Sequence, residues 1–264
     1  MLLRAWLSAI LVVGAVFGQQ EVYEQYRRWI TTQPVAVQKE AEPLARYREH
    51  LRGKGLDEQT VEAQIELIRK QGSRMEVERW NRILTAPKPA FNVEPNAFLV
   101  EMVKGRKPGK ALDVGMGQGR NAIWLAQQGW ESVGFDPAER AVAAAVATAQ
   151  KLGVKLQTEI ATAESFDFGE NRWDLVVLSY VGAREFHEKV VRSLKPGGIV
   201  VLEAMHRDAT KGRSIGGAVV FDSGELPGLF RELRMVRYQE PLSVADFGRE
   251  RVRLVQMCGE KPGE

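Results

Sequence analysis

Apolar residues after position 110 gather in short runs, and the stretches between these runs have helical character. One run, Trp173–Ser179, is almost unbroken, which is typical of a strand buried on both faces of a sheet. Strands that alternate with helices indicate the α/β class, a parallel sheet with helices on both faces. The predicted strands are a first one that ends at Asp113, followed by 131–135, 156–160, 173–179 and 199–203, with helices over 138–152, 183–193 and 225–233.

Two further apolar stretches close the chain. Met235–Pro241 and Glu250–Cys258 are predicted as strands joined through a polar turn. Before them, residues 194–198 read Leu-Lys-Pro-Gly-Gly, whose proline and glycines are expected to break the preceding helix sharply. The fifth strand is therefore expected to begin at Ile199.

The region 19–88 lies outside this sheet pattern and has the period of amphipathic helices. Its apolar positions recur at helical spacing at Val22, Tyr26, Trp29 and Ile30, and again at Val61, Ile65 and Ile68. Gly53 and Gly55 separate the two halves, and residues 86–89 read as a boundary loop. We expect a helical N-terminal extension over 19–88 that packs on a sheet domain over 89–264. Three alternative roles of this extension are compatible with the same pattern: it could cap an active site, form a dimer or contact a membrane.

The first 18 residues differ from both regions. One early charge, Arg4, precedes an apolar run that ends in small residues before Gln19. A basic start, an apolar core and a small-residue end are the features of a secretory signal peptide. The run is shorter than the ~20 residues of a membrane-spanning helix, so we expect 1–18 to be cleaved. The alternative is a buried or interfacial helix, with membrane contact limited to this segment.

Composition narrows the classes of function. The 264 residues carry a net charge of +3, and acidic and basic residues are interspersed. A basic cluster from Lys104 to Lys110 is interpreted as a solvated loop, and no basic-plus-aromatic pattern indicates a nucleic-acid partner. The single cysteine, Cys258, excludes an intrachain disulfide framework, and with only three histidines it argues against a Cys/His metal site.

The stretch from 111 to 136 carries the candidate chemistry. A strand ends in Asp113, three glycines follow at alternate positions (Gly115, Gly117 and Gly119), and Asp136 follows the next strand. Glycine allows the backbone angles and the close approach of a tight strand-to-helix turn, and the helix start offers free N–H groups. An acid that ends the second strand of a β-α-β unit is placed to accept hydrogen bonds from a ribose diol. This pattern predicts a nucleoside-cofactor site.

The spacing of these residues separates two cofactors. A dinucleotide site requires G-x-G-x-x-G, but Arg120 stands where the third glycine would fall. Asp113, two residues before the first glycine, would repel a pyrophosphate and suits a cationic amino-acid group. S-adenosylmethionine carries an ammonium, a sulfonium and a ribose diol but no phosphate. The residues therefore favour S-adenosylmethionine over NAD, and no metal is expected.

Asp113, the glycines and Asp136 resemble motif I and the following acidic strand end of class I S-adenosylmethionine-dependent methyltransferases, and the Pro-Gly-Gly turn resembles theirs too. The resemblance covers about residues 90–260. It implies a Rossmann-like, doubly wound sheet of seven strands that is mostly parallel, with an antiparallel last strand. Within the class, 117–126 and 221–230 resemble the tellurite-resistance and thiopurine methyltransferase branch, which implies a small-molecule methyl acceptor.

Charge and position in the proposed site suggest roles for single residues. Arg120 would pair with the methionyl carboxylate of the cofactor, unless it forms a surface salt bridge, and Pro137 would pack by the adenine. Thr162 stands where the family often has an acid for the adenine amino group. That role then falls to Glu164, to the backbone of Ala163 or to no residue.

Residues before the first strand and after the fourth strand complete the predicted site. Ser179 and Tyr180, which end the fourth strand, are expected beside the sulfonium. In small-molecule methyltransferases of this class, the segment before the first strand often closes over the ligands, so Phe91 and Asn96 are candidate lid residues.

Methyl transfer needs little from the protein, because the sulfonium is already electrophilic and a nucleophile held in line suffices. A base is required only if the acceptor must lose a proton. Candidate bases are Tyr180, His187, Glu203 and His206, of which His206 and Tyr180 are predicted as catalytic. A thiolate, selenide or telluride acceptor would need no base.

Two other functions stay open. An NAD(P)-dependent oxidoreductase would use a similar sheet, and a non-catalytic protein that binds S-adenosylmethionine would account for Thr162 and the signal-like start. The compartment is open as well. The signal-like start indicates export or membrane attachment, whereas dependence on S-adenosylmethionine indicates the cytoplasm.

Overall fold

The computed structural model describes residues 18–38, 43–213 and 215–263. The predicted signal peptide therefore lies outside the described residues, apart from Gly18. The chain divides into two compact units. One holds the described residues up to Arg79 together with 215–217, and the other holds Trp80–Arg213 and the described residues from Ala218 onward. No described helix is both long enough and apolar enough to cross a membrane.

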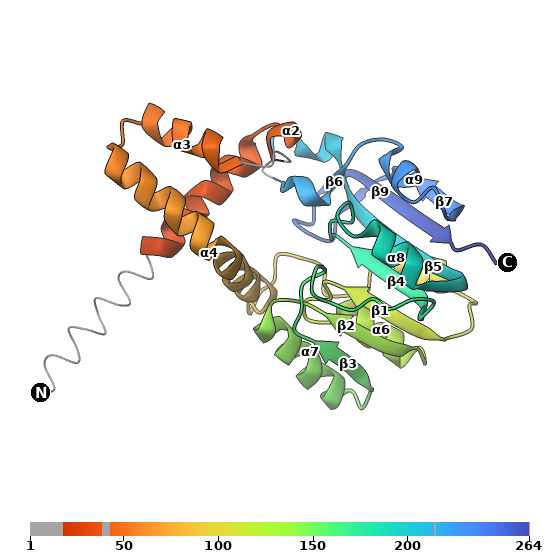
Figure 1. Ribbon diagram of the computed structural model, residues 1–264. Coiled ribbons are helices and arrows are strands. Elements are labelled where there is room, and N and C mark those ends of the chain that lie inside the picture. The colour runs from red at the N-terminus through yellow and green to blue at the C-terminus, as the bar shows by residue number, and fades with distance from the viewer. Residues whose placement is uncertain (1–17, 39–42, 214, 264) are drawn as a thin grey trace, which may run out of the picture. The chain divides into compact units, whose positions relative to one another are not determined.

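The first unit consists of helices, drawn in red and orange in Figure 1. Its helices are residues 18–32, α2 (Val35–Gln38), α3 (Pro43–Gly53) and most of α4 (Glu58–Leu84). Tyr47 and Leu51 of α3 pack with Val61 and Ile65 of α4 in a buried core. Gly55, with a φ of +81°, lies in the turn between α3 and α4, where the sequence predicts a break.

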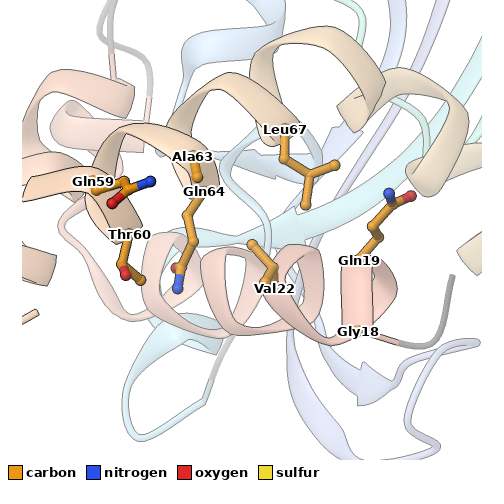
Figure 2. Close-up of a pocket in the computed structure, with 8 residues that line it drawn as sticks. All are labelled: Gly18, Gln19, Val22, Gln59, Thr60, Ala63, Gln64 and Leu67. Carbon is orange, nitrogen blue, oxygen red and sulfur yellow. The ribbon is translucent and has the colours of Figure 1, made fainter. Parts of the chain in front are cut away.

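A surface pocket of about 460 Å³ lies between the first helix and α4 in this unit. Figure 2 shows side chains from both helices around it, and none of them carries a charge. The lining residues are Gly18, Gln19, Val22, Gln59, Thr60, Ala63, Gln64 and Leu67. None of them is among the residues predicted to bind a cofactor.

The second unit is built on one sheet (Figure 1). Its strands are β1 (Lys110–Val114), β2 (Glu131–Phe135), β3 (Leu156–Glu159), β4 (Trp173–Ser179), β5 (Leu194–His206), β6 (Val220–Phe221), β7 (Arg234–Gln239), β8 (Leu242–Val244) and β9 (Arg251–Glu260). The order is β3-β2-β1-β4-β5-β9-β7, while β6 pairs with β5 and β8 pairs with β9. Strand β9 runs antiparallel to β5, β7 and β8, and the other described pairings are parallel. The predicted α/β sheet, mostly parallel with an antiparallel last strand, is confirmed, and the short β6 and β8 bring it to nine strands.

Successive residues of a strand point to opposite faces of a sheet. Helices pack against both faces here, so the sheet has two cores. One core contains Leu112, Val176 and Val200 with Val190 and Val191 of α8 (His187–Ser193). The other contains Ala111, Leu175 and Ile199 with Phe98 and Leu99 of α5 (Ala97–Val103) and Leu125 of α6 (Arg120–Gln127). The remaining helices are α7 (Glu139–Lys151), α9 (Glu225–Leu229) and the short 3-10 turns η1 (Arg207–Thr210) and η2 (Gly217–Val219). The doubly wound arrangement is therefore confirmed.

Strand β5 begins at Leu194 rather than at the predicted Ile199. Leu194 pairs with Trp173, and the register shifts before Leu175. A Cβ on Gly198 would lie 2.7 Å from the backbone oxygen of Trp173, so only glycine fits there. The proline and glycines therefore form an irregular start of the strand, in the manner of a β-bulge, instead of a turn that precedes it.

Two helices are shorter than the sequence predicts. Helix α8 begins at His187 rather than at Ala183, because residues 184–186 form a turn. Helix α9 ends at Leu229 rather than at Leu233. Pro227 and Gly228 are the two weakest helix formers, and they lie directly before this end.

Candidate cofactor-binding site

Three glycines form the turn between β1 and α6. Gly115, Gly117 and Gly119 have φ angles of +62°, +57° and +79°, in the left-handed region that side chains other than glycine rarely adopt. A Cβ on Gly119 would also lie 2.9 Å from the Cβ of Ala145, and one on Gly115 would lie 2.8 Å from Val181 Cγ2. Both the backbone and the packing therefore require glycine at these positions.

Asp113 holds this turn from the strand side. Its Oδ2 accepts a hydrogen bond from the backbone N–H of Ala122, at 3.1 Å, in the first turn of α6. Gly119 at the N-cap has no side chain to offer, so Asp113 binds one of the N–H groups that a helix start leaves free. Complete burial raises the pKa of Asp113 to about 7, although Arg120 and the Ala122 N–H act in the opposite direction.

Asp136 holds the turn from the neighbouring strand. It is buried directly after β2, and its Oδ2 accepts from the N–H of Gly117 at 2.9 Å. Its Oδ1 accepts from the N–H of Ala138 at 2.8 Å, before the start of α7. Burial raises its pKa, and the two N–H groups partly offset this. The structure thus brings the predicted ribose-binding acid into direct contact with the central glycine.

The last residues of α4, which belong to the second unit, contact this turn and the start of α7. Leu84 packs against Gly117, since a Cβ there would lie 3.2 Å from Leu84 Cδ2. Asn81 is fully buried, and its Oδ1 accepts from the N–H of Arg140 at 2.9 Å while its Nδ2 donates to Glu139 Oε1 at 2.8 Å. Sequence reasoning missed Asn81 because an isolated asparagine in a helical stretch carries no spacing signal.

Arg120 forms a buried ion pair, contrary to the surface salt bridge considered from the sequence. Its guanidinium donates to Asp246 Oδ2 at 2.7 Å and to Ser179 Oγ at 3.0 Å. A further N–H donates to the carbonyl oxygen of Glu94 at 2.9 Å. The side chains of Arg120 and Asp246 are only 9% and 11% exposed. Asp246 lies in the turn between β8 and β9, which the sequence marks only as polar.

The predicted lid segment is tied to the same carboxylate. Asn96 caps α5 by accepting from the N–H of Leu99, and its Nδ2 donates to Asp246 Oδ2 at 2.8 Å and to Glu203 Oε1 at 2.7 Å. Phe91 is buried and stacks on Phe247, with ring centres 5.3 Å apart. The segment before β1 is therefore bound to the ends of β5 and β8.

The hydroxyl of Tyr180, a predicted catalytic residue, both donates and accepts a hydrogen bond. The hydroxyl donates to Glu203 Oε1 at 2.9 Å and accepts from the N–H of Asp246 at 3.0 Å. Burial and the neighbouring Glu203 raise its pKa well above the usual range, so the phenol keeps its proton. Its φ of +58° places a non-glycine residue in the left-handed region at the end of β4, a strain that is often found at functional sites.

His206, the other predicted catalytic residue, belongs to a separate cluster. Its Nδ1 accepts from the N–H of Asp208 at 3.0 Å, so the neutral ring carries its proton on Nε2. Nε2 lies 3.0 Å from Ser223 Oγ, which donates to Glu240 Oε2 at 2.8 Å. Both ring nitrogens are therefore engaged, and Ser223 and Glu240 are partners that sequence reasoning missed. His187 lies elsewhere, with Nδ1 2.8 Å from the carbonyl oxygen of Arg184.

The residues predicted near the adenine follow β2 and β3. The N–H of Asp136 donates to the carbonyl oxygen of Glu159 at 3.2 Å, which joins the ends of these strands just before Pro137. Glu164 is exposed, and a hydrogen bond with Thr162 lowers its pKa. The carbonyl oxygens of Ala163 and Glu164 accept from Lys189. In the described part of the chain, no group of three His, Cys, Asp or Glu side chains could hold a metal ion.

A model of a family of methyltransferase domains matches residues 111–198. The ribosomal RNA small subunit methyltransferase C of Alcanivorax borkumensis is 32% identical over 128 residues, which are 42% of this chain and 38% of that protein. The ubiquinone biosynthesis O-methyltransferase of Rickettsia prowazekii is 33% identical over 101 residues, which are 36% of this chain and 40% of that protein. The chain therefore spans about two fifths of the length of these curated relatives.

Solved structures share the fold. The N-methyltransferase NodS from Bradyrhizobium japonicum, solved in complex with S-adenosyl-L-homocysteine, matches with a TM-score of 0.56 at 19% identity, over 71% of this chain and 98% of that one. The match extends the similarity beyond residues 111–198, and at this identity it concerns the fold alone.

Proposed function

We propose that this chain, whose residues 111–198 belong to a family of methyltransferase domains, is a class I S-adenosylmethionine-dependent methyltransferase that acts on a small molecule. One observation carries the cofactor assignment. The buried carboxylate of Asp136 binds the N–H of Gly117 at 2.9 Å, in a turn that has no room for side chains at Gly115 and Gly119.

The donor and acceptor groups of this turn fit S-adenosylmethionine. A carboxylate has about four acceptor positions, and Asp136 uses one on each oxygen for a backbone N–H. Positions therefore remain for two ribose hydroxyls. The carboxylate of Asp136 disfavours a pyrophosphate by charge repulsion, whereas the ammonium and sulfonium of S-adenosylmethionine are attracted.

Further roles are assigned by position. Asp113 holds the turn, Ser179 at the end of β4 would contact the methyl sulfonium end of the cofactor, and Pro137, Ala163 and Glu164 would contact the adenine. Arg120 would bind the methionyl carboxylate, because it follows the glycine turn and reaches Ser179. When bound, the cofactor supplies an electrophilic methyl group, and these residues bind and orient it.

The acceptor is proposed to be a small molecule. The relatives differ in this respect, since one is named for ribosomal RNA and another for ubiquinone biosynthesis. The resemblance of 117–126 and 221–230 to the tellurite-resistance and thiopurine branch supports the small acceptor. The basic cluster supports it too, because Arg106 pairs with Glu260 at 3.3 Å and Lys110 with Glu131 at 3.0 Å, which reduces the charge that could attract nucleic acid.

Transfer is proposed to proceed without a protein base. Tyr180 keeps its proton, and both nitrogens of His206 are engaged. An acceptor that presents its own electron pair at neutral pH, such as a thiolate, needs only to be held in line with the methyl group. The contribution of the protein is then positioning.

Titration calorimetry of the full chain with S-adenosylhomocysteine, and with NAD for comparison, tests the proposal. We expect micromolar binding of S-adenosylhomocysteine and none of NAD. Asp136→Asn should weaken this binding about tenfold or more, because an amide replaces a charged acceptor of two N–H groups and the ribose diol. The exposed Asp167→Asn serves as the matched control and should bind like the wild type.

The other outcomes separate the alternatives. Binding of NAD in place of S-adenosylhomocysteine would make the protein a dinucleotide enzyme. Binding of S-adenosylhomocysteine without methyl transfer to any member of a panel of thiols, amines and ribosomal RNA would identify a non-catalytic binding protein. Failure of the folded protein to bind either ligand would contradict the proposal.

A further inference from the structure

The buried pair of Arg120 and Asp246 joins the start of α6 to the turn between β8 and β9. Arg120 directly follows Gly119 and also donates to Ser179 at the end of β4. Its side chain therefore extends from the helix start that follows the glycine turn to the end of β4, where the proposed function places the methionyl end of the cofactor. A carboxylate of the chain already binds this guanidinium.

We propose that Asp246 is an internal carboxylate that the methionyl carboxylate of S-adenosylmethionine displaces from Arg120, so that cofactor binding releases the turn at 245–249. This inference rests on the proposed function. It makes Asp246 a competitor of the cofactor for Arg120 and assigns the turn between β8 and β9 as the part of the site that moves.

The exchange replaces one carboxylate by another, so Arg120 stays paired. A buried charge that loses its partner is strongly destabilising, which makes a like-for-like exchange the least costly route. Arg120 keeps its bonds to Ser179 Oγ and to the carbonyl oxygen of Glu94. Asn96 keeps its bond to Glu203 when Asp246 leaves.

The Asp246 carboxylate makes three of the hydrogen bonds that attach the turn, beside those that its backbone makes with Tyr180 and Asn92. The carboxylate accepts from Arg120 at 2.7 Å, from Asn96 at 2.8 Å and from Asn92 at 2.9 Å. Gly248 and Arg249 then follow with φ angles of +77° and +53°. The left-handed backbone is strained for arginine, so release of the carboxylate removes three of the bonds that hold a strained turn in place.

Two ligands that differ only in the carboxylate isolate this competition. S-adenosylmethionine and its decarboxylated form share the ammonium, the sulfonium and the nucleoside. Removal of the negative charge in Asp246→Asn changes the attraction of both cations alike, whereas release of Arg120 favours only the ligand with a carboxylate. We expect Asp246→Asn to raise the ratio of the two association constants about tenfold, as expected when a competing internal state is removed.

Matched variants define the outcome by titration calorimetry of the full chain. Glu250→Gln removes the next acid along the chain, which pairs with Arg213 at the surface, and should leave the ratio unchanged. Arg120→Gln should abolish the preference for S-adenosylmethionine, also in combination with Asp246→Asn. A ratio that stays constant or falls in Asp246→Asn would show that Asp246 only supports Arg120, and would overturn the inference.

Hydrogen exchange of the wild type gives a second readout that needs no variant. The N–H of Asn92 donates to the carbonyl oxygen of Asp246 at 2.7 Å. The N–H of Gly248 donates to the carbonyl oxygen of Ala90 at 3.2 Å. S-adenosylmethionine should speed exchange at these amides, and the decarboxylated form should not. Equal or greater protection with S-adenosylmethionine would contradict the release of the turn. If neither ligand binds the wild type, the proposed function itself fails.

Discussion

Asp113 and Asp136 are buried carboxylates with different surroundings. Asp113 is closed in by β1 and α6 and accepts from Ala122, whereas Asp136 accepts one N–H from Gly117 and one from Ala138. Burial raises the pKa of both groups. Because two N–H groups support the charged form of Asp136, this residue is the better acceptor for a ligand, while Asp113 fixes the turn.

The titration of Asp113 predicts a pH dependence of stability. Its pKa is about 7 in the folded protein and about 3.9 in an unfolded chain. The folded state therefore binds more protons between these values, and the free energy of unfolding falls as the pH rises from about 4 to about 7. Asparagine does not titrate, so the wild type should lose stability relative to Asp113→Asn over this range.

Urea unfolding of both proteins at several pH values measures this difference. The exposed Asp167→Asn controls for the loss of one negative charge. If the free energy of unfolding of the wild type, minus that of Asp113→Asn, stays constant or rises between about pH 4 and about pH 7, the raised pKa is contradicted.

The N-terminus of helix α7 is capped by a residue of helix α4. Ala138 stands at its N-cap and offers no side-chain acceptor. Asn81, near the end of α4, supplies the missing acceptor to the N–H of Arg140 and also binds Glu139. One helix thus completes the start of another, and the contact places Leu84 against Gly117.

Asn81→Ala should lower the free energy of unfolding by about 1–2 kcal/mol, the usual effect of losing a cap in a buried setting. Urea unfolding followed by circular dichroism measures the change. Gln59→Ala, at an exposed position of the same helix, should have a much smaller effect. Equal effects of the two variants would show that the cap contributes nothing beyond helix propensity.

On the scale of the whole sheet domain, a polar network joins segments that are far apart in the chain. Asn96, Arg120, Tyr180, Glu203 and Asp246 meet at the carboxyl ends of β4 and β5. Ligands of open α/β sheets bind outside the carboxyl ends of the strands. The network therefore ties the proposed site to the last turn of the chain, between β8 and β9.

Tyr180→Phe tests the contribution of this network to stability. Loss of the hydroxyl leaves Glu203 with one donor fewer and the N–H of Asp246 without its acceptor. We expect the free energy of unfolding to fall by about 1–3 kcal/mol. Tyr238→Phe removes a hydroxyl from the half-buried cluster around Glu240 and should cost less. An equal or larger cost for Tyr238→Phe would contradict the importance of the network.

The local pattern along the chain was sufficient for the α/β class, the order of the longer strands and helices, and the candidate cofactor turn, whereas the short β6 and β8 were not predicted. Buried strands are apolar because both faces are covered, and glycines at alternate positions mark a backbone that other residues cannot adopt. Asp113 and Asp136 stand beside these glycines in consecutive elements, so their meeting follows from the β-α-β unit. These features depend on neighbours within a few tens of residues.

Contacts between distant segments depended on the three-dimensional arrangement. Asp246 meets Arg120, and Asn81 meets Arg140, with no spacing in the chain that relates one residue to the other. The protonation state of Tyr180 could not be predicted from the sequence either, because its pKa depends on burial and on Glu203, which comes from the next strand. Hydrogen bonds and pKa shifts depend on which groups are close in space. Residues on separate strands and loops come close only when the chain folds, so the sequence alone does not reveal these contacts.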